Sequence, residues 1–348
     1  MEQRHGKAIL IILVCLLSLL SAVLAVGFLK IRAGNRELND RIAQLEEELS
    51  EPVDIEELMA SSEGVELSNG EIYYSRETIK QKARDAVSLT ELMSMIFSDK
   101  AVYYDGEKYI YAPLSDKLNR HDYDLDRIVT DKKSDLKGYT DGKGRVGLKG
   151  IDVSTWQGDI DWAAVKNDGV KFAFLRAGYR GYESGNIYED DTLINNLSGA
   201  NENGIPVGVY FYSQAATPAE AVEEAEYILQ LIAGYDVSWP IVFDMELEES
   251  ASSRTRDLTP ERRTDIAIAF CDRIADAGYT PMIYGNMRML CGEMQPERLG
   301  KYEKWLAQYF YKPRYPYEFG IWQYTSEGHI DGIDGNVDIN LAFRDYGK

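Results

Sequence analysis

The segment Trp239-Pro240-Ile241-Val242-Phe243-Asp244-Met245-Glu246 joins an apolar run to two acids. The apolar part is too short for an independent helix and is rich in β-forming residues, so it predicts a buried strand. On a strand, residues i and i+2 lie on the same side, roughly 6.6–6.8 Å apart along the axis. We therefore expect Asp244 and Glu246 to project together from the carboxyl end of this strand.

Two carboxylates held close together cannot both ionise freely, so the pKa of one of them tends to rise. A protonated acid beside an ionised neighbour is the arrangement that cleaves glycosidic bonds. Glu248 continues the same alternation and competes with Glu246 for this role. It lies further from the apolar run, however, and we expect it to be exposed. Because buried carboxylates are costly without a purpose, the pair Asp244 and Glu246 favours a catalytic site.

From Leu148 onward, apolar strands alternate with helices. Gly169, Gly204 and Gly278 each precede a strand, as expected of glycines that end helices, and Thr217-Pro218 and Thr259-Pro260 are typical of helix starts. Eight strands are predicted, at residues 150–153, 171–175, 207–211, 240–244, 281–284, 304–309, 320–324 and 337–341. This alternation predicts an α/β fold with a largely parallel sheet, and eight strands permit a TIM-like barrel. Its closure should be irregular, because the late helices are short or absent.

Polar residues gather at the predicted carboxyl ends of these strands, where barrels of this kind carry their chemistry. The candidate catalytic acids are Asp152, Asp244, Glu246 and Asp338. The candidate substrate-binding residues are Tyr210, Tyr212, Tyr284, Gln308, Tyr309, Trp322 and Gln323. Aromatic rings suit the apolar faces of sugars, and carboxylates and amides suit their hydroxyl groups. Taken singly, the outer aspartates fit helix caps or turns and the aromatic residues fit core packing; together they favour a site.

The amino-terminal part contains an uncharged segment, residues 8–29, that is long enough for the roughly 30 Å core of a bilayer. We predict an uncleaved membrane anchor there, with residues 1–7 as a cytoplasmic tail; a cleaved signal peptide is the alternative. Residues 30–52 read as a stalk. Apolar residues between positions 38 and 49 recur at heptad-like spacing, which permits either a short coiled coil that pairs two chains or a solvated helix.

Residues 53–145 are predicted to form a small α+β domain to which we assign no role. It should hold a helix over residues 76–97 and a hairpin over residues 101–111, because Asp105-Gly106 is a favoured turn sequence. The glycine-rich residues 137–147 read as a linker. Residues 146–348 then form the barrel domain.

Charge and composition argue against several classes of ligand, namely nucleic acids, metals and cofactors. The net charge of −20 disfavours nucleic acid as a partner. The three cysteines and three histidines have no zinc-binding spacing, and we expect no metal and no cofactor. Cys271 and Cys291 either pair or remain separate thiols; the sequence leaves this open.

Residues 149–343 resemble the family 25 glycoside hydrolases, lysozymes of the Chalaropsis type. The resemblance rests on the following segments: 150–154 with 156–162, 208–212, 243–246, 305–309, 321–326 and 335–340. It implies a flattened β/α barrel that hydrolyses the β-1,4 bond between N-acetylmuramic acid and N-acetylglucosamine in peptidoglycan, with net retention. It also implies that Glu246 is the general acid and that Asp244 orients the substrate acetamido group. Many relatives carry His where this chain has Phe211.

We therefore expect a muramidase anchored in the cell membrane by a single span, with its catalytic domain facing the cell wall and peptidoglycan strands as its partner. The charges that flank residues 8–29 do not fix this orientation, so the location of the substrate decides it. The first alternative is a peptidoglycan-binding module without turnover. The others are a carboxylate–metal hydrolase, which chelators would inhibit, and a scaffold in which the amino-terminal half has the main role.

Overall fold

The computed structural model describes residues 65–66, 72–86, 88–132, 134–248 and 250–347. No helix within these ranges is both long enough and apolar enough to cross a membrane. The predicted tail, the anchor at residues 8–29 and the stalk with its possible coiled coil at residues 38–49 lie outside the described residues, so they stay predictions.

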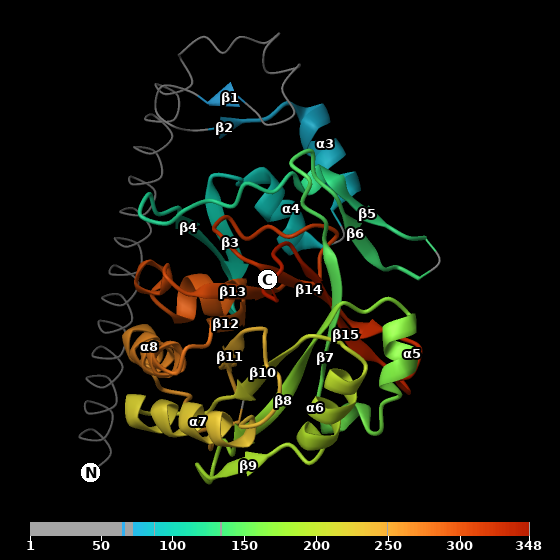
Figure 1. The fold of residues 1–348 in the computed structure, drawn as a ribbon. Coiled ribbons are helices and arrows are strands. Elements are labelled where there is room, and N and C mark those ends of the chain that lie inside the picture. The colour runs from blue at the N-terminus through green and yellow to red at the C-terminus, as the bar shows by residue number, and fades with distance from the viewer. Residues whose placement is uncertain (1–64, 67–71, 87, 133, 249, 348) are drawn as a thin grey trace, which may run out of the picture. The chain divides into compact units, whose positions relative to one another are not determined.

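Eight strands form a closed barrel, and the prediction of eight strands is confirmed (Figure 1). They are β7 (Leu148–Val153), β8 (Phe172–Arg180), β10 (Val207–Tyr212), β11 (Ile241–Asp244), β12 (Pro281–Asn286), β13 (Glu303–Ala307), β14 (Ile321–Gly328) and β15 (Val337–Ala342). The ring closes because β7 pairs with both β8 and β15 while β8 also pairs with β10. All neighbours in the ring are parallel except β15, which is antiparallel to β14 and to β7. A short strand that the sequence did not predict, β9 (Ile187–Glu189), extends β8 outside the ring.

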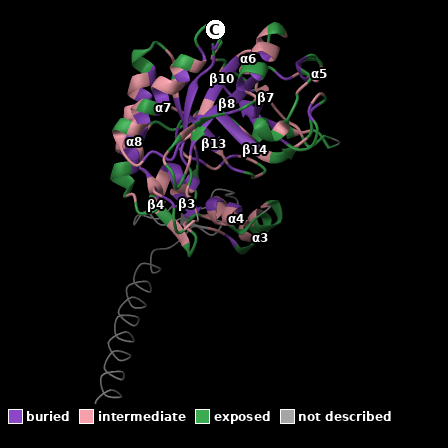
Figure 2. Cartoon of the chain, turned by 90° about the horizontal axis from the view of Figure 1, so that it is seen from below, coloured by how far each residue is buried: buried purple, intermediate pink, exposed green. Residues whose placement is uncertain are grey.

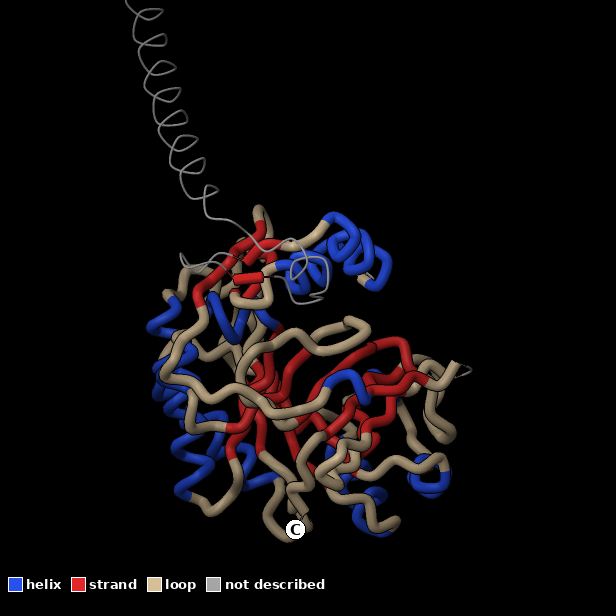
Figure 3. The backbone as a smooth tube through the Cα atoms, turned by 90° about the horizontal axis from the view of Figure 1, so that it is seen from above, coloured by secondary structure: helices blue, strands red, loops and turns tan. Residues whose placement is uncertain are grey.

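Helices connect the early strands and cover the outside of the barrel, as Figure 3 shows. They are α5 (Trp162–Asn167), α6 (Leu193–Glu202), α7 (Pro218–Leu231) and α8 (Pro260–Asp276). The predicted starts are confirmed, because the Thr217 and Thr259 hydroxyls accept hydrogen bonds from backbone N–H groups in the first turns of α7 and α8. Only the π-helical turn η3 (Met289–Glu293) and the 3₁₀ turn η4 (Pro296–Leu299) separate β12 from β13. Among the described residues no helix follows β13, which accounts for the irregular closure.

The barrel has two apolar cores, and Figure 2 shows its strands as almost continuously buried. One core lies between the strands and the surrounding helices. The other fills the interior of the barrel near the amino ends of the parallel strands. There the rings of Phe172 and Trp239 stack with their centroids 4.0 Å apart, and those of Phe174 and Trp305 stack with their centroids 4.6 Å apart. Gly150 makes room for these rings, since a Cβ atom there would lie 2.1 Å from the Phe172 ring. The interior is therefore filled at the amino ends of the parallel strands, which leaves room for a cavity at their carboxyl ends.

The elements before the barrel are short. They are β1 (Val65–Glu66), β2 (Ile72–Tyr73), α3 (Arg76–Asp85), α4 (Leu89–Ile96), β3 (Lys100–Tyr104), β4 (Tyr109–Pro113), η1 (Leu125–Arg127), β5 (Ile128–Thr130) and β6 (Lys137–Tyr139). The predicted hairpin is confirmed by the antiparallel pair β3–β4. The predicted single helix over residues 76–97 is wrong, because Ser88 caps a second helix by accepting a 3.1 Å hydrogen bond from Glu91 N. The predicted linker is also corrected, since it contains β6, which pairs with β5.

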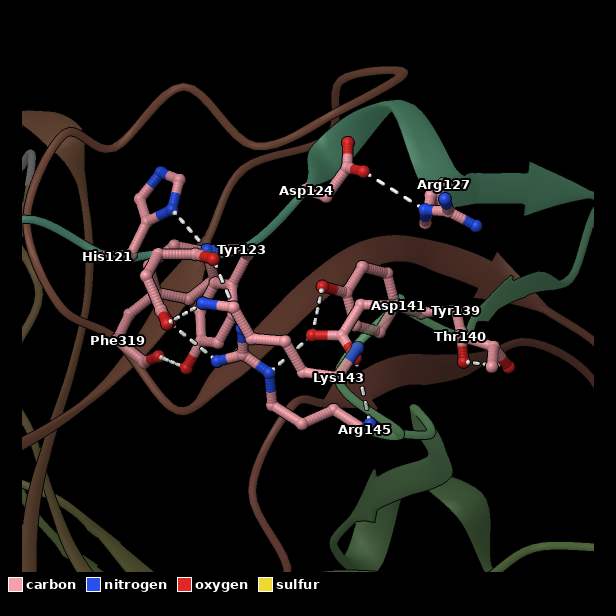
Figure 4. A network of polar contacts seen from close by, with 11 residues as sticks. His121, Tyr123, Asp124, Arg127, Tyr139, Thr140, Asp141, Lys143, Arg145 and Phe319 are labelled. Atoms are coloured by element: carbon pink, nitrogen blue, oxygen red, sulfur yellow. Dashed lines mark hydrogen bonds and ion pairs between the residues drawn. The ribbon is translucent and has the colours of Figure 1, made fainter.

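The chain divides into two compact units, residues 1–81 and 82–348. The second unit therefore includes much of the segment that we assigned to a separate domain; the role of residues 53–145 stays a prediction. Figure 4 shows how polar groups tie part of this segment together. Arg145 pairs with Asp141 and Asp122 at 2.6 Å each, and the Tyr123 hydroxyl donates to the Phe319 carbonyl oxygen at 2.5 Å. Cys271 and Cys291 are separate free thiols.

Candidate active site

Strand register places the predicted acids on the inner face of the barrel. Residues paired across neighbouring strands share a face, and alternate residues along one strand share it too. Asp152 pairs with Asp338 on β15, and Asp244 pairs with Tyr212 on β10 and Tyr284 on β12. Along β7 and β11, these acids follow the inward-facing Gly150 and Val242. A polar layer therefore lies directly above the aromatic interior, at the carboxyl ends of the parallel strands.

This polar layer surrounds a cavity of about 330 Å³, which we call the acid cavity. It is lined by Asp152, Ser154, Trp156, Gln157, Arg176, Tyr210, Tyr212, Asp244, Glu246, Tyr284, Trp305, Tyr309, Gln323 and Asp338. The structure thus brings together all four predicted acids. It also brings in five of the seven predicted substrate-binding residues. Glu246 lies two residues past Asp244, just beyond the end of β11, as the alternation predicts.

Two predicted substrate-binding residues lie elsewhere, and we correct them. Trp322 is completely buried in the core outside the strands, where its indole N–H donates to the Gln308 carbonyl oxygen at 2.6 Å. Its neighbour Gln323 faces the cavity, and adjacent strand residues point to opposite faces. Gln308 follows the end of β13, and its side-chain oxygen accepts a 2.6 Å hydrogen bond from Arg314 N. It therefore holds the following loop in place.

Five lining residues were not predicted as site residues: Ser154, Trp156, Gln157, Arg176 and Trp305. Trp156 is 82% exposed, so its ring forms an open platform at the rim. The turn η2 (Thr155–Gln157) holds it there, because Ser154 and Gln157 exchange side-chain and backbone hydrogen bonds. Arg176 follows Phe174 at the strand spacing of two, which is a signal that would have placed it in the cavity.

Amide side chains fix the orientation of Asp152. Its Oδ2 accepts hydrogen bonds from Asn340 Nδ2 at 2.7 Å and from Gln323 Nε2 at 3.0 Å. Asn340 is itself oriented by the Trp305 indole, which donates to its Oδ1 at 2.7 Å, and Tyr284 donates to Gln323 Oε1 at 2.9 Å. Burial, followed by the charge of the facing aspartate, raises the pKa of Asp152 well above its usual range despite these donors.

Asp244 is buried, and its Oδ1 has no hydrogen-bond partner among the described residues. Burial raises the pKa of Asp244 well above its usual range, and the charges of Glu246 and Asp152 add to the effect. The Arg176 guanidinium opposes it. Arg176 is held in place by Asp190, whose Oδ2 accepts from its Nε at 2.7 Å. Since an unsatisfied buried oxygen is costly, Asp244 Oδ1 is suited to a donor brought by a ligand.

Glu246 is the exposed acid of the set, and its carboxylate forms no hydrogen bond among the described residues. Surrounding protein still excludes enough water to raise its pKa, and Glu248 and Asp338 raise it further. Glu248 accepts a 2.6 Å hydrogen bond from the Tyr212 hydroxyl and does not line the acid cavity. Burial raises the pKa of the half-buried Asp338 to about 6.

The arrangement supplies an accessible carboxylic acid with a raised pKa, which lines the same cavity as three further acids. This combination provides general acid catalysis together with electrostatic stabilisation of a cationic transition state. Tyrosine rings and the exposed Trp156 offer surfaces on which sugar rings stack. Among the described residues, no group of three or more His, Cys, Asp or Glu side chains has the arrangement of a metal site.

Comparison with known proteins places this cavity in a family. A model of the glycosyl hydrolases family 25 matches residues 151–333. An autolytic lysozyme of Clostridium acetobutylicum is 25% identical over 194 residues, which cover 56% of this chain and 55% of that protein. Lysozyme M1 of Streptomyces globisporus is 29% identical over 203 residues, covering 56% of this chain and 67% of that protein.

Among solved structures, the modular autolysin LytC of Streptococcus pneumoniae superimposes with a TM-score of 0.50 at 25% identity, covering 68% of this chain and 53% of that one. LytC has also been solved in complex with a synthetic peptidoglycan ligand. The chain spans about half the length of the Clostridium lysozyme and of LytC.

Proposed function

The chain belongs to glycosyl hydrolase family 25, and we propose that it hydrolyses the β-1,4 bond between N-acetylmuramic acid and N-acetylglucosamine in peptidoglycan. One observation carries the proposal: an accessible acid, Glu246, shares a cavity with the buried Asp244, whose Oδ1 has no hydrogen-bond partner among the residues that the structure describes. Lysozymes among its relatives, and a structural neighbour bound to a peptidoglycan ligand, support the choice of substrate.

Glu246 acts as the general acid in this proposal. Its proton passes to the glycosidic oxygen as the bond to the muramic acid anomeric carbon breaks, and N-acetylglucosamine departs with a new hydroxyl group. A general acid must be protonated at working pH, so the raised pKa of Glu246 suits the role. Because no described residue forms a hydrogen bond with this carboxyl group, the group can reach the substrate.

Asp244 positions the substrate acetamido group. Its Oδ1, which has no partner in the described part of the chain, accepts the acetamido N–H, and this makes the acetamido oxygen a better nucleophile toward the anomeric carbon. Attack by that oxygen and then by water inverts the carbon twice, so net configuration is retained. Asp338, with a pKa of about 6, is ionised at neutral pH and stabilises the positive charge that develops on the sugar, and Asp152 faces it from β7. The ring and hydroxyl groups of the sugar are bound by Tyr210, Tyr212, Tyr284, Tyr309 and Gln323.

We propose further that residues 8–29 anchor the chain in the cell membrane and that the barrel faces the cell wall. The support is the uncharged length of this segment, which matches a bilayer core. Residues 38–49 would pair two chains as a short coiled coil above the membrane. Protease accessibility of the barrel on intact cells tests the orientation, and cross-linking through residues 38–49 tests the pairing.

The variant Glu246→Gln tests the catalytic proposal, because it keeps the shape and hydrogen-bonding capacity of the side chain but cannot donate the proton. We expect loss of lysis of purified peptidoglycan, with binding to the same walls retained in a pull-down. Activity near that of the unaltered protein would remove Glu246 from the role of acid. Binding without turnover by the unaltered protein would favour the alternative of a non-catalytic wall-binding module.

A further inference from the structure

A second and larger groove adjoins the acid cavity. It has a volume of about 700 Å³, compared with about 330 Å³ for the acid cavity, and Glu246 lines both. Its walls come from the segment between β11 and α8, from the start of α8 and from the chain that runs from the end of β12 through η3. We call it the arginine groove, because Arg256, Arg263 and Arg288 line it.

The acid cavity is lined by one basic side chain, Arg176, among the described residues, whereas three arginines line this groove. Arg263 and Arg288 share one acid: Glu293 accepts from Arg263 at 2.9 Å and from Arg288 at 3.0 Å. Arg256 is exposed, and its guanidinium forms no ion pair or hydrogen bond among the described residues. The groove is also lined by Glu246, Glu248, Asp257 and Glu293, so its lining is not basic overall. Since Glu293 occupies Arg263 and Arg288, the exposed Arg256 is the arginine of this groove that is suited to a carboxylate ligand.

The position of Glu246 tells which part of the substrate reaches this groove, if the proposed function holds. The general acid stands at the glycosidic oxygen, and the acid cavity on one side of it holds the sugar that is attacked. Because Glu246 lines both spaces and the attacked sugar takes the acid cavity, the arginine groove is the space that remains for the leaving-group side of the strand. Every second sugar there is a muramic acid, whose lactyl group carries a peptide with free carboxylates.

A segment outside the family match supports this wall. The turn between β3 and β4 reaches Arg288, since a Cβ atom built on Gly106 would lie 3.2 Å from Arg288 Nη1. The backbone N–H groups of Lys108 and Glu107 lower the pKa of Asp105 in the same turn, and the charge of Arg288 adds a smaller effect in the same direction. Tyr103 on β3 packs against Gly292 in η3. Residues before the barrel therefore help to shape the groove.

We infer that the arginine groove binds the peptide stem on the leaving-group side of the cleavage site, with Arg256 pairing with a peptide carboxylate. The enzyme would accordingly prefer glycan strands that still carry their peptides. This inference rests on the proposed function and adds to it a preference between two forms of the same polymer. Arg256 contributes to binding and has no part in the chemical step.

The test compares two substrates: teichoic-acid-free, uncross-linked strands with peptides, and the same strands after an amidase has removed the peptides. Stripped strands keep the lactyl carboxylate, so the comparison reports on the peptide and not merely on a negative charge near the sugar. The proteins are the full chain, Arg256→Gln, and the control Arg127→Gln. Arg127 is an exposed residue outside the groove that pairs with Asp124.

We expect the full chain to cleave peptide-bearing strands with the higher kcat/KM. Arg256→Gln should reduce that preference about fivefold through KM, which is the size of effect that an exposed charged contact supplies. Arg127→Gln should keep the preference. An unchanged preference in Arg256→Gln, or an equal loss on both substrates, would overturn the inference alone. Failure of the full chain to cleave either substrate would overturn the proposed function and the inference with it.

Discussion

Asp152 and Asp338 stand directly opposite each other on the antiparallel strands β7 and β15. Residues paired in this way have Cβ atoms about 4.5–5.5 Å apart, and like charges there repel. The register of the barrel thus imposes the pairing, and β15 is the strand that departs from the parallel order. The consequence is a raised pKa at both carboxyl groups, from burial first and, for Asp152, from the Asp338 charge next.

Replacing Asp338 by Asn should stabilise the protein more at neutral pH than in acid. The pKa of Asp338 is 3.8 as a free reference and about 6 in the fold. Between these values the folded protein holds more protons than the unfolded chain, so the free energy of unfolding falls as pH rises through this window and stays lower above it. An Asn side chain does not titrate, so the variant does not lose this free energy of unfolding as the pH rises. Relative to the unaltered protein, the variant should gain on the order of 1–2 kcal/mol between pH 3.5 and 7, after allowance for solvent screening.

Urea unfolding of both proteins at pH 3.5 and pH 7 measures this gain. A stability difference that is the same at the two pH values would show that Asp338 titrates in the fold as it does in the unfolded chain.

Replacing Glu248 by Gln should move the pH dependence of catalysis. After burial, the Glu248 charge is the largest contribution that raises the pKa of Glu246. Removing that charge lowers the Glu246 pKa, so the general acid loses its proton at a lower pH. The alkaline limb of the kcat/KM profile should therefore shift to lower pH, while the amide oxygen of Gln still accepts from Tyr212. Glu261→Gln, at an exposed position in α8, is the control and should leave the profile in place. An unshifted limb in Glu248→Gln would contradict the assignment of Glu246 as the acid that sets it.

Replacing Gly150 by Ala should destabilise the barrel. The added Cβ would lie 2.1 Å from the Phe172 ring, which is itself stacked on Trp239, so neither ring has room to retreat. Overpacking of this kind costs about 1–3 kcal/mol. Gly142→Ala is the matched control, because its Cβ would meet nothing within 4 Å, and it should change stability by about 0.5 kcal/mol or less. Thermal unfolding distinguishes the two, and equal effects would mean that the interior is more loosely packed than the structure shows.

Replacing Arg180 by Met should be strongly destabilising because of Glu224. Both side chains are buried, and Glu224 accepts from Arg180 Nε and from the Ser213 hydroxyl at 2.6 Å each. Removing the arginine leaves a buried acid without its partner, which costs about 3–5 kcal/mol. The double variant Arg180→Met, Glu224→Leu should recover much of this loss. Denaturant unfolding of the two variants decides the matter, and a double variant no more stable than the single one would show that the pair is not coupled.

The fold could be predicted largely from local patterns. The eight barrel strands follow from short apolar runs, and the helix starts at Thr217 and Thr259 follow from capping chemistry. The break between α3 and α4 was missed although Ser88 and Glu91 have the spacing of a capped start. The antiparallel direction of β15 was not predictable, because it depends on how the ring closes and not on any residue within the strand.

The acids of the site could be predicted because each follows an apolar run at a strand end. The prediction for Trp322 overlooked the alternation of side chains along a strand: Gln323 faces the cavity, so its neighbour Trp322 faces the outside of the ring. The pairing of Asp152 with Asp338 and the approach of the β3–β4 turn to Arg288 bring together residues that are far apart in sequence. A local sequence pattern cannot predict which residues far apart in sequence come together, and only the folded structure shows these two contacts.

Mass spectrometry of the fragments that the full chain releases from purified peptidoglycan tests the central claim most directly, with Glu246→Gln as the parallel sample. Cleavage as proposed leaves N-acetylmuramic acid at the new reducing ends, and the variant should release none of these fragments. Reducing N-acetylglucosamine ends, or equal release by the variant, would contradict the claim.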